Sequence, residues 1–98
     1  MKLKAIFAYA VRIDMDTKKF KALLDEQMSW PDYYNFKFIT KTEKKHLLLE
    51  ELSDHSIDEK QSRNGKYTSI TSRKILYSSE EVITVYKRVG QIEGVITL

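Results

Sequence analysis

Few residues in this chain of 98 have side chains suited to catalysis or metal binding. There is no cysteine, so disulfides, thiolate metal sites and cysteine nucleophiles are excluded. The two histidines, His46 and His55, are too far apart in sequence for a known ligand motif, and we expect both to be solvated surface residues. The sequence therefore predicts no metal site.

Other kinds of catalysis also lack their usual motifs. No Gly-x-Ser-x-Gly turn is present to carry a nucleophile, and the three glycines are too scattered to form a phosphate-binding loop. We expect Gly65 to lie in a hairpin turn, Gly90 to end a helix in the C′ position, and Gly94 to mark a bulge or a close backbone approach inside a strand. The chain is therefore expected to be no enzyme and to need no cofactor.

Charge and hydropathy indicate whether the chain would bind nucleic acid or a membrane. The net charge is only +3, and acidic and basic residues are interspersed. The lysine clusters Lys18, Lys19, Lys21 and Lys44, Lys45 are typical of solvated helix faces, whereas a nucleic-acid binder usually has a basic stripe. The apolar run after the initial MKLK is short for a signal peptide, and no run approaches the ~20 apolar residues of a membrane span. We expect a cytoplasmic protein with no membrane association, for which a nucleic-acid partner is the less favoured alternative.

The elements that would position any site begin with a helix. Residues 17–28 place apolar side chains on one stripe, and Trp30-Pro31 ends the helix because proline disfavours helical geometry in the residue before it. We expect Trp30 to anchor this helix to the domain. A strand follows over residues 33–40, with Tyr34, Phe36 and Phe38 on one face. Thr40 and Glu43 have capping-box spacing, which predicts a short helix that buries Leu48, Leu49 and Leu52 and leaves Leu47 exposed.

The sharpest local pattern is Asn64-Gly65 between strand-like runs at 56–63 and 66–76. Asn-Gly favours a two-residue type I′ turn, because both central residues of that turn need positive φ angles. Such a turn places Ile57 opposite Ser72, Glu59 opposite Ile70 and Lys60 opposite Ser69.

A second capping box, Ser78 to Glu81, opens a helix whose apolar stripe is Val82, Val85, Tyr86 and Val89. Residues 92–98 are the last predicted strand. The order predicts an α+β fold, a ferredoxin-like βαββαβ two-layer sandwich with a four-stranded antiparallel sheet, preceded by an N-terminal helix.

In that fold the first and third strands are central, and one sheet face is free of helices. The side chains expected there form the candidate binding face: Asn35, Lys37, Tyr67, Ser69, Thr71 and Arg73. RNA-recognition domains of this topology stack bases on aromatic residues at these strands, but the run Gly65 to Ile70 lacks their aromatic-rich signature. A solvated or dimer-covered face is the simpler interpretation.

Several motifs also resemble one protein family. They are Trp30-Pro31, Tyr34, Phe36-Lys37-Phe38-Ile39, Ser62-x-Asn64-Gly65-Lys66-Tyr67-x-Ser69-Ile70, Glu80-Glu81-Val82-Ile83 with Tyr86-Lys87, Ile92-Glu93-Gly94-Val95-Ile96 and Leu98. In this order they are similar to the YbeD-like bacterial family, domain of unknown function 493. The resemblance spans 15–98 as one domain and leaves 1–14 as an N-terminal extension. The short helix within residues 41–53 departs from the family pattern.

The resemblance implies a fold similar to the ACT regulatory domain, a ferredoxin-like module that binds amino acids at dimer interfaces, and it implies no catalytic residues. Together with the residues themselves, it indicates a non-catalytic binding module. We expect a small-molecule sensor or a protein adaptor that acts as a homodimer. The alternative is a single-stranded RNA-binding domain that uses the open sheet face.

Overall fold

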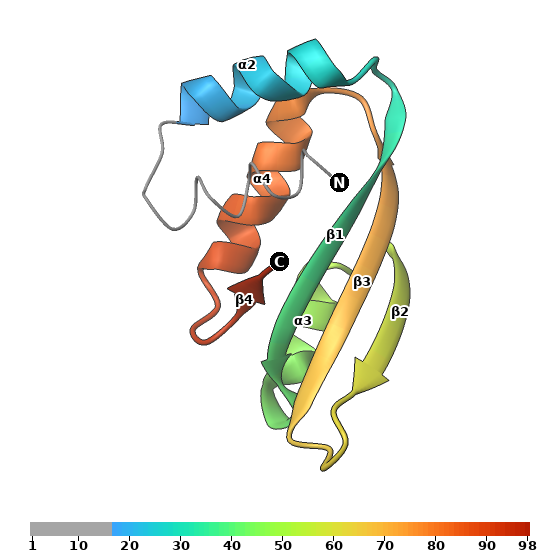
Figure 1. Cartoon of the computed structure of the whole chain (residues 1–98), viewed down its shortest axis with the longest axis vertical. Helices are drawn as coiled ribbons and strands as arrows, with labels where there is room; N and C mark the ends of the chain where they lie inside the picture. Colours follow the sequence, from blue (N-terminus) through green and yellow to red (C-terminus); the bar gives the residue numbers. More distant parts are fainter. Residues whose placement is uncertain (1–16) are drawn as a thin grey trace.

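A computed structural model describes residues 17–98 (Figure 1), so the extension predicted over 1–14 lies outside the described residues. The elements are helix α2 (Thr17–Gln27), strand β1 (Asp32–Lys41), the 3-10 helix η1 (Thr42–Lys44), helix α3 (Lys45–Glu51), strands β2 (Ser56–Gln61) and β3 (Tyr67–Leu76), helix α4 (Ser79–Gly90) and strand β4 (Ile96–Thr97). A leading helix thus precedes the predicted βαββαβ order.

The four strands form one antiparallel sheet in the order β2-β3-β1-β4. The two central strands, β1 and β3, pair over their whole length, from Asp32 opposite Leu76 to Lys41 opposite Tyr67. This is the strand order of the ferredoxin-like sandwich, and the predicted fold class is confirmed.

All three described helices pack on the same face of the sheet, and they share one hydrophobic core with it. The buried apolar residues are Phe20, Leu24, Tyr34, Phe36, Phe38, Leu48, Leu52, Ile70, Leu76, Val82, Tyr86 and Val89. Alternation along β1 sends every second side chain into this core, and the stripe on α4 supplies the opposing layer. None of the described helices is long and apolar enough to cross a membrane.

Helix α2 ends one residue earlier than predicted, at Gln27, although the amide of Met28 still donates to the carbonyl of Leu24 at 2.9 Å. Trp30 is partly buried against the core, and its Nε1 donates to Asp25 Oδ1 at 3.2 Å. The indole therefore links the segment after α2 back to the helix and to the domain.

The hairpin between β2 and β3 has the predicted register but a different turn. Ile57 pairs with Ser72, Glu59 with Ile70 and Lys60 with Ser69. The turn hydrogen bond, however, runs from the amide of Gly65 to the carbonyl of Ser62 at 2.9 Å, so the type I′ assignment is wrong.

The loop covers residues 63–66, and Ser62 N donates to Tyr67 O at 2.8 Å across its base. Gly65 has a φ of 75° at the last position of the turn. Asn64 acts through its side chain instead, because Oδ1 accepts from Lys66 N at 3.0 Å and from Ser62 Oγ at 3.1 Å. These side-chain bonds replace the backbone pairing that a tighter turn would make.

One of the two predicted capping boxes is present. Ser78 Oγ accepts from Glu81 N at 3.3 Å, and Glu81 Oε1 accepts from Tyr77 N at 3.1 Å, so α4 begins as predicted. The Thr40 cap is wrong, because pairing with β3 extends β1 to Lys41 and buries Thr40 in the sheet. Lys41 precedes η1 without a side-chain cap.

The C-terminal strand is shorter than predicted. Gly90 is the last residue of α4 and does not adopt a positive φ, so it is not the expected C′ glycine. Strand β4 contains only Ile96 and Thr97, although Leu98 N continues the pairing by donating to Lys37 O at 2.9 Å. Gly94 lies in the turn before β4 with a φ of 85°, and no described atom approaches the position of a Cβ, so it marks neither a bulge nor a close approach.

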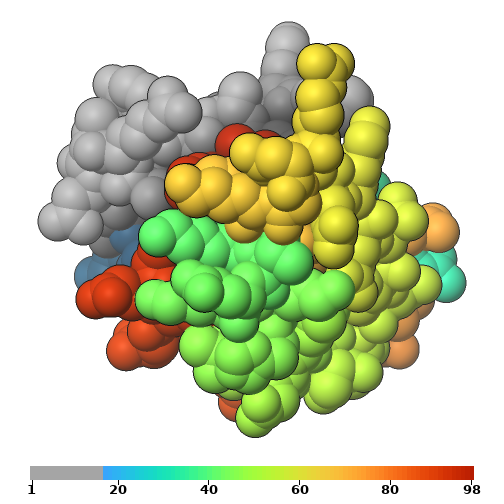
Figure 2. Space-filling view, turned by 90° about the horizontal axis from the view of Figure 1, so that it is seen from below, coloured from blue at the N-terminus to red at the C-terminus, as the bar shows by residue number. Residues whose placement is uncertain are grey.

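One end of the molecule is formed by α3 and the β2–β3 loop, which lie side by side in Figure 2. The amide of Thr42 donates to the carbonyl of Lys66 at 2.9 Å, and the hydroxyls of Thr42 and Thr68 are 2.8 Å apart. These contacts connect the start of the first crossover to the hairpin.

Candidate functional site

The open sheet face consists of the side chains of β1 and β3 that point away from the helices. All six residues of the candidate binding face lie on it. Asn35 is directly opposite Arg73, and Lys37 is opposite Thr71, so these four side chains form the middle of the face. Tyr67 and Ser69 continue it toward the hairpin, while Trp30-Pro31 and Asn64-Gly65 lie outside it, before β1 and in the β2–β3 loop.

Tyr33 belongs to this face, and the sequence analysis missed it. The guanidinium carbon of Arg73 lies 4.0 Å from the centroid of the Tyr33 ring, and the tyrosine is 53% exposed. A cation over an aromatic face is attracted by the ring quadrupole, so the two side chains hold one another in place. The signal was available, because Tyr33 is two residues before Asn35 in the same alternating pattern.

Exposed apolar side chains lie at both ends of the face. Ile75 is opposite Tyr33, and Ile96 is opposite Ile39 at the β4 edge. Ile75, Ile96 and Tyr67 all count among the exposed large hydrophobic residues. The face is therefore more apolar than the six predicted residues suggested, with a polar and cationic middle.

The side chains of this face offer several kinds of group to a partner. They present guanidinium, ammonium, amide and hydroxyl groups beside aromatic and aliphatic surface. The six predicted residues include no carboxylate or imidazole, but Asp58 of β2 is opposite Thr71 and lies on the same face. No cluster of three His, Cys, Asp or Glu residues within 17–98 is placed to hold a metal ion.

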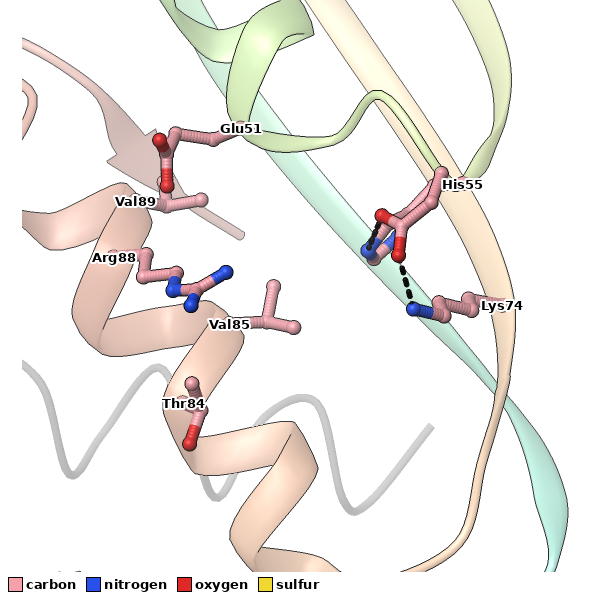
Figure 3. Close-up of a pocket in the computed structure, with 8 residues that line it drawn as sticks. Glu51, His55, Lys74, Thr84, Val85, Arg88 and Val89 are labelled. Carbon is pink, nitrogen blue, oxygen red and sulfur yellow. Dashed lines mark hydrogen bonds and ion pairs between the residues drawn. The ribbon is translucent and has the colours of Figure 1, made fainter.

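One histidine differs from the prediction. His46 is exposed, as expected, but the side chain of His55 is only 2% exposed and packs on Phe36 with ring centroids 5.6 Å apart. Burial lowers the pKa of His55, while the neighbouring Asp54 carboxylate opposes that shift. Asp54 also forms an ion pair with Lys74, whose ammonium group Figure 3 shows on the same side of the pocket as His55. Spacing alone carried no sign of this burial, which comes from packing against Phe36, a residue 19 positions earlier in the sequence.

Comparison with protein families places the chain in one of them. No curated protein and no solved structure matches it significantly. Residues 25–98 match the model of a family described as a protein of unknown function, DUF493. The match begins within α2, ten residues later than the resemblance suggested, and it includes every strand of the sheet. Because it covers well over half of the sequence, the chain belongs to the DUF493 family.

Proposed function

We propose that this chain is a non-catalytic binding module that forms a homodimer through its open sheet face, and that it acts as a sensor or adaptor. The observation that carries the proposal is the Tyr33–Arg73 stack beside exposed Ile75. Aromatic residues and arginine are enriched in the buried centres of protein interfaces. An exposed apolar patch bordered by polar residues is also typical of an interaction surface.

RNA binding is the alternative, and the spacing of the aromatic side chains argues against it. Tyr33 and Tyr67 lie at opposite ends of the paired strands, since Tyr67 is opposite Lys41. Eight residues separate Tyr33 from Lys41, which corresponds to about 27 Å along a strand. Two rings so far apart cannot stack successive bases as RNA-recognition sheets do.

Charge reversal on the face tests the dimer. We expect the wild-type chain to dimerise in analytical ultracentrifugation and the Lys37→Glu/Arg73→Glu variant to be monomeric with an unchanged circular dichroism spectrum. The matched control is Lys19→Glu/Lys87→Glu, which makes the same charge change at exposed helix positions and should remain dimeric. A wild-type chain that stays monomeric at every concentration, or a control that dissociates equally, would contradict the proposal.

The wild-type chain and its variants also test the RNA-binding alternative. A phosphate-binding face loses affinity steeply with added salt, because each phosphate contact releases counterions. Micromolar binding of single-stranded RNA that weakens with salt and disappears in Tyr67→Ala would favour RNA recognition over dimerisation.

A further inference from the structure

A groove between α4 and β3 lies mainly on the helix-covered side of the sheet and reaches the open face only at Ile75. It consists of a pocket of about 60 Å³ between α3, β3 and α4 (Figure 3) and an adjoining open hollow of about 410 Å³ toward the start of α4. Both are lined by Lys74, Thr84, Val85 and Arg88. The groove exists because α3 has seven residues and is about 10 Å long, whereas the ten residues of β3 extend for about 33 Å.

Most charged groups along the groove already have partners. Lys74 pairs with Asp54, Glu80 lies 3.7 Å from Lys21, and Glu81 accepts from the amide of Tyr77. Arg88 stands between the two hollows, and within residues 17–98 its guanidinium forms no ion pair or hydrogen bond. Glu51 lines only the smaller pocket and makes no ion pair with Arg88. The carboxylates of Glu80 and Glu81 also line the larger hollow, but they lie at the start of α4, about 10–12 Å along the helix axis from Arg88. At the Arg88 end of this hollow, the guanidinium is therefore a cation without an ion-pair partner among the described residues.

The floor of the smaller pocket contains a second unpaired group. His55 lines it with a side chain that is almost fully buried, and Nδ1 has no hydrogen-bond partner among the described residues. A buried polar atom without a partner is unfavourable, so a bound polar group would stabilise this position. The larger hollow adds an apolar wall from Leu76, Tyr77 and Val85.

We propose that this groove binds a small organic carboxylate with a hydrocarbon body. The carboxylate pairs with the Arg88 guanidinium, whose planar fork suits two parallel hydrogen bonds, and the body lies against the apolar wall. The hollow is within the size range of small-molecule sites. This proposal goes beyond dimerisation and rests on other residues, namely Arg88 and the apolar wall, although Ile75 borders both the larger hollow and the open sheet face.

Three probes of the full chain test the chemistry by NMR titration. Hexanoate carries the charge and the body, hexylammonium carries the same body with the opposite charge, and inorganic phosphate carries negative charge without a body. We expect saturable shifts along the groove with hexanoate alone. We also expect the His55 imidazole to titrate at higher pH when hexanoate is bound, since a nearby anion favours the imidazolium.

Two substitutions locate the contact. Arg88→Gln should weaken hexanoate binding about tenfold or more, as expected when a charged hydrogen-bond donor is lost. Lys87→Gln removes the same charge from the neighbouring exposed position and should leave the affinity unchanged. The proposal is overturned if hexylammonium or phosphate binds as well as hexanoate, if Arg88→Gln binds normally, if both variants lose affinity equally, or if hexanoate never saturates.

Discussion

The hydroxyls of Tyr34 and Tyr86 are 3.0 Å apart in the buried core. Tyr34 is on β1 and Tyr86 is on α4, and their rings meet edge to face with centroids 6.1 Å apart. Each hydroxyl thus gains a partner in a region that would otherwise penalise it. The pair connects the sheet to the helix layer at the centre of the fold.

Removing both of these hydroxyls should cost less than the two single removals added together. Tyr86→Phe leaves the Tyr34 hydroxyl buried without this partner, and we expect a loss of about 1–3 kcal/mol in the free energy of unfolding. Tyr34→Phe/Tyr86→Phe should be less destabilised than the sum of the two single variants. Urea denaturation of all four proteins measures the coupling, and strictly additive losses would show that the hydrogen bond contributes nothing.

The same pair predicts sensitivity to high pH. Burial raises the pKa of Tyr34 and of Tyr86 above the ordinary tyrosine value of 10.0. The folded state therefore holds both protons more tightly than the unfolded chain, and this contribution is complete below about pH 10 and is lost as the pH rises above it. The urea midpoint of the wild type should fall over this range by more than that of Tyr34→Phe/Tyr86→Phe. If the urea midpoints of the two proteins fall in parallel as the pH rises, the tyrosine pair is not the cause of the sensitivity.

Mild acid should lower the free energy of unfolding through protonation of His55. Burial lowers its pKa below the ordinary 6.5, with Lys74 acting in the same direction and Asp54 opposing. The neutral form is favoured on folding, so this stability is present above about pH 6.5 and is lost as the pH falls below that value. The other charged residues that line the pocket around His55 are Glu51 and Arg88.

His55→Gln should flatten this part of the pH profile, whereas His46→Gln, at an exposed position, should reproduce the wild-type slope. Chemical denaturation over about pH 5–7.5 covers the histidine window, and Asp54 titrates below it because Lys74 holds the pKa of its carboxyl low. Equal slopes in wild type and His55→Gln would remove His55 as the cause.

Gly65 should tolerate substitution poorly. Its φ of 75° is strained for a β-branched residue, so Gly65→Val should cost about 1–3 kcal/mol. Gly90 provides the matched control, because it is helical with open space around its Cβ position, and Gly90→Ala should be neutral or stabilising by up to about 1 kcal/mol. An unchanged denaturation midpoint for Gly65→Val would contradict the turn described for the hairpin.

Residues 1–14 are predicted to be dispensable for folding. The core uses Phe20 and Leu24 from α2, and the family match begins later still, at residue 25. Deleting 1–14 should leave the melting temperature nearly unchanged, while deleting 1–27 removes α2 and should lower it by many degrees. A large loss from the shorter deletion would show that the extension contributes to the domain.

Local sequence patterns predicted correctly those features that depend on residues close together in the chain. The α4 stripe and its Ser78 cap follow from helical periodicity and from an amide that needs an acceptor. The hairpin register was also correct although its turn was not, because a two-residue loop and a four-residue loop centred on Asn64-Gly65 impose the same pairing. The family and the sheet order were likewise predictable from motifs and element order.

Contacts between segments distant in sequence decided the features that local patterns did not predict. Thr40 has capping-box spacing, but ten residue pairs between β1 and β3 outweigh one capping hydrogen bond and keep it in the strand. His55 is buried because it packs on Phe36 of β1, and Arg88 borders a groove because α3 is too short to cover it. The sequence by itself determined the order and type of the helices and strands, because these depend mainly on neighbours along the chain, whereas the ends of β1 and β4 depend on strand pairing. Only the tertiary structure decided which side chains meet, because burial and free charge depend on segments that are distant in sequence.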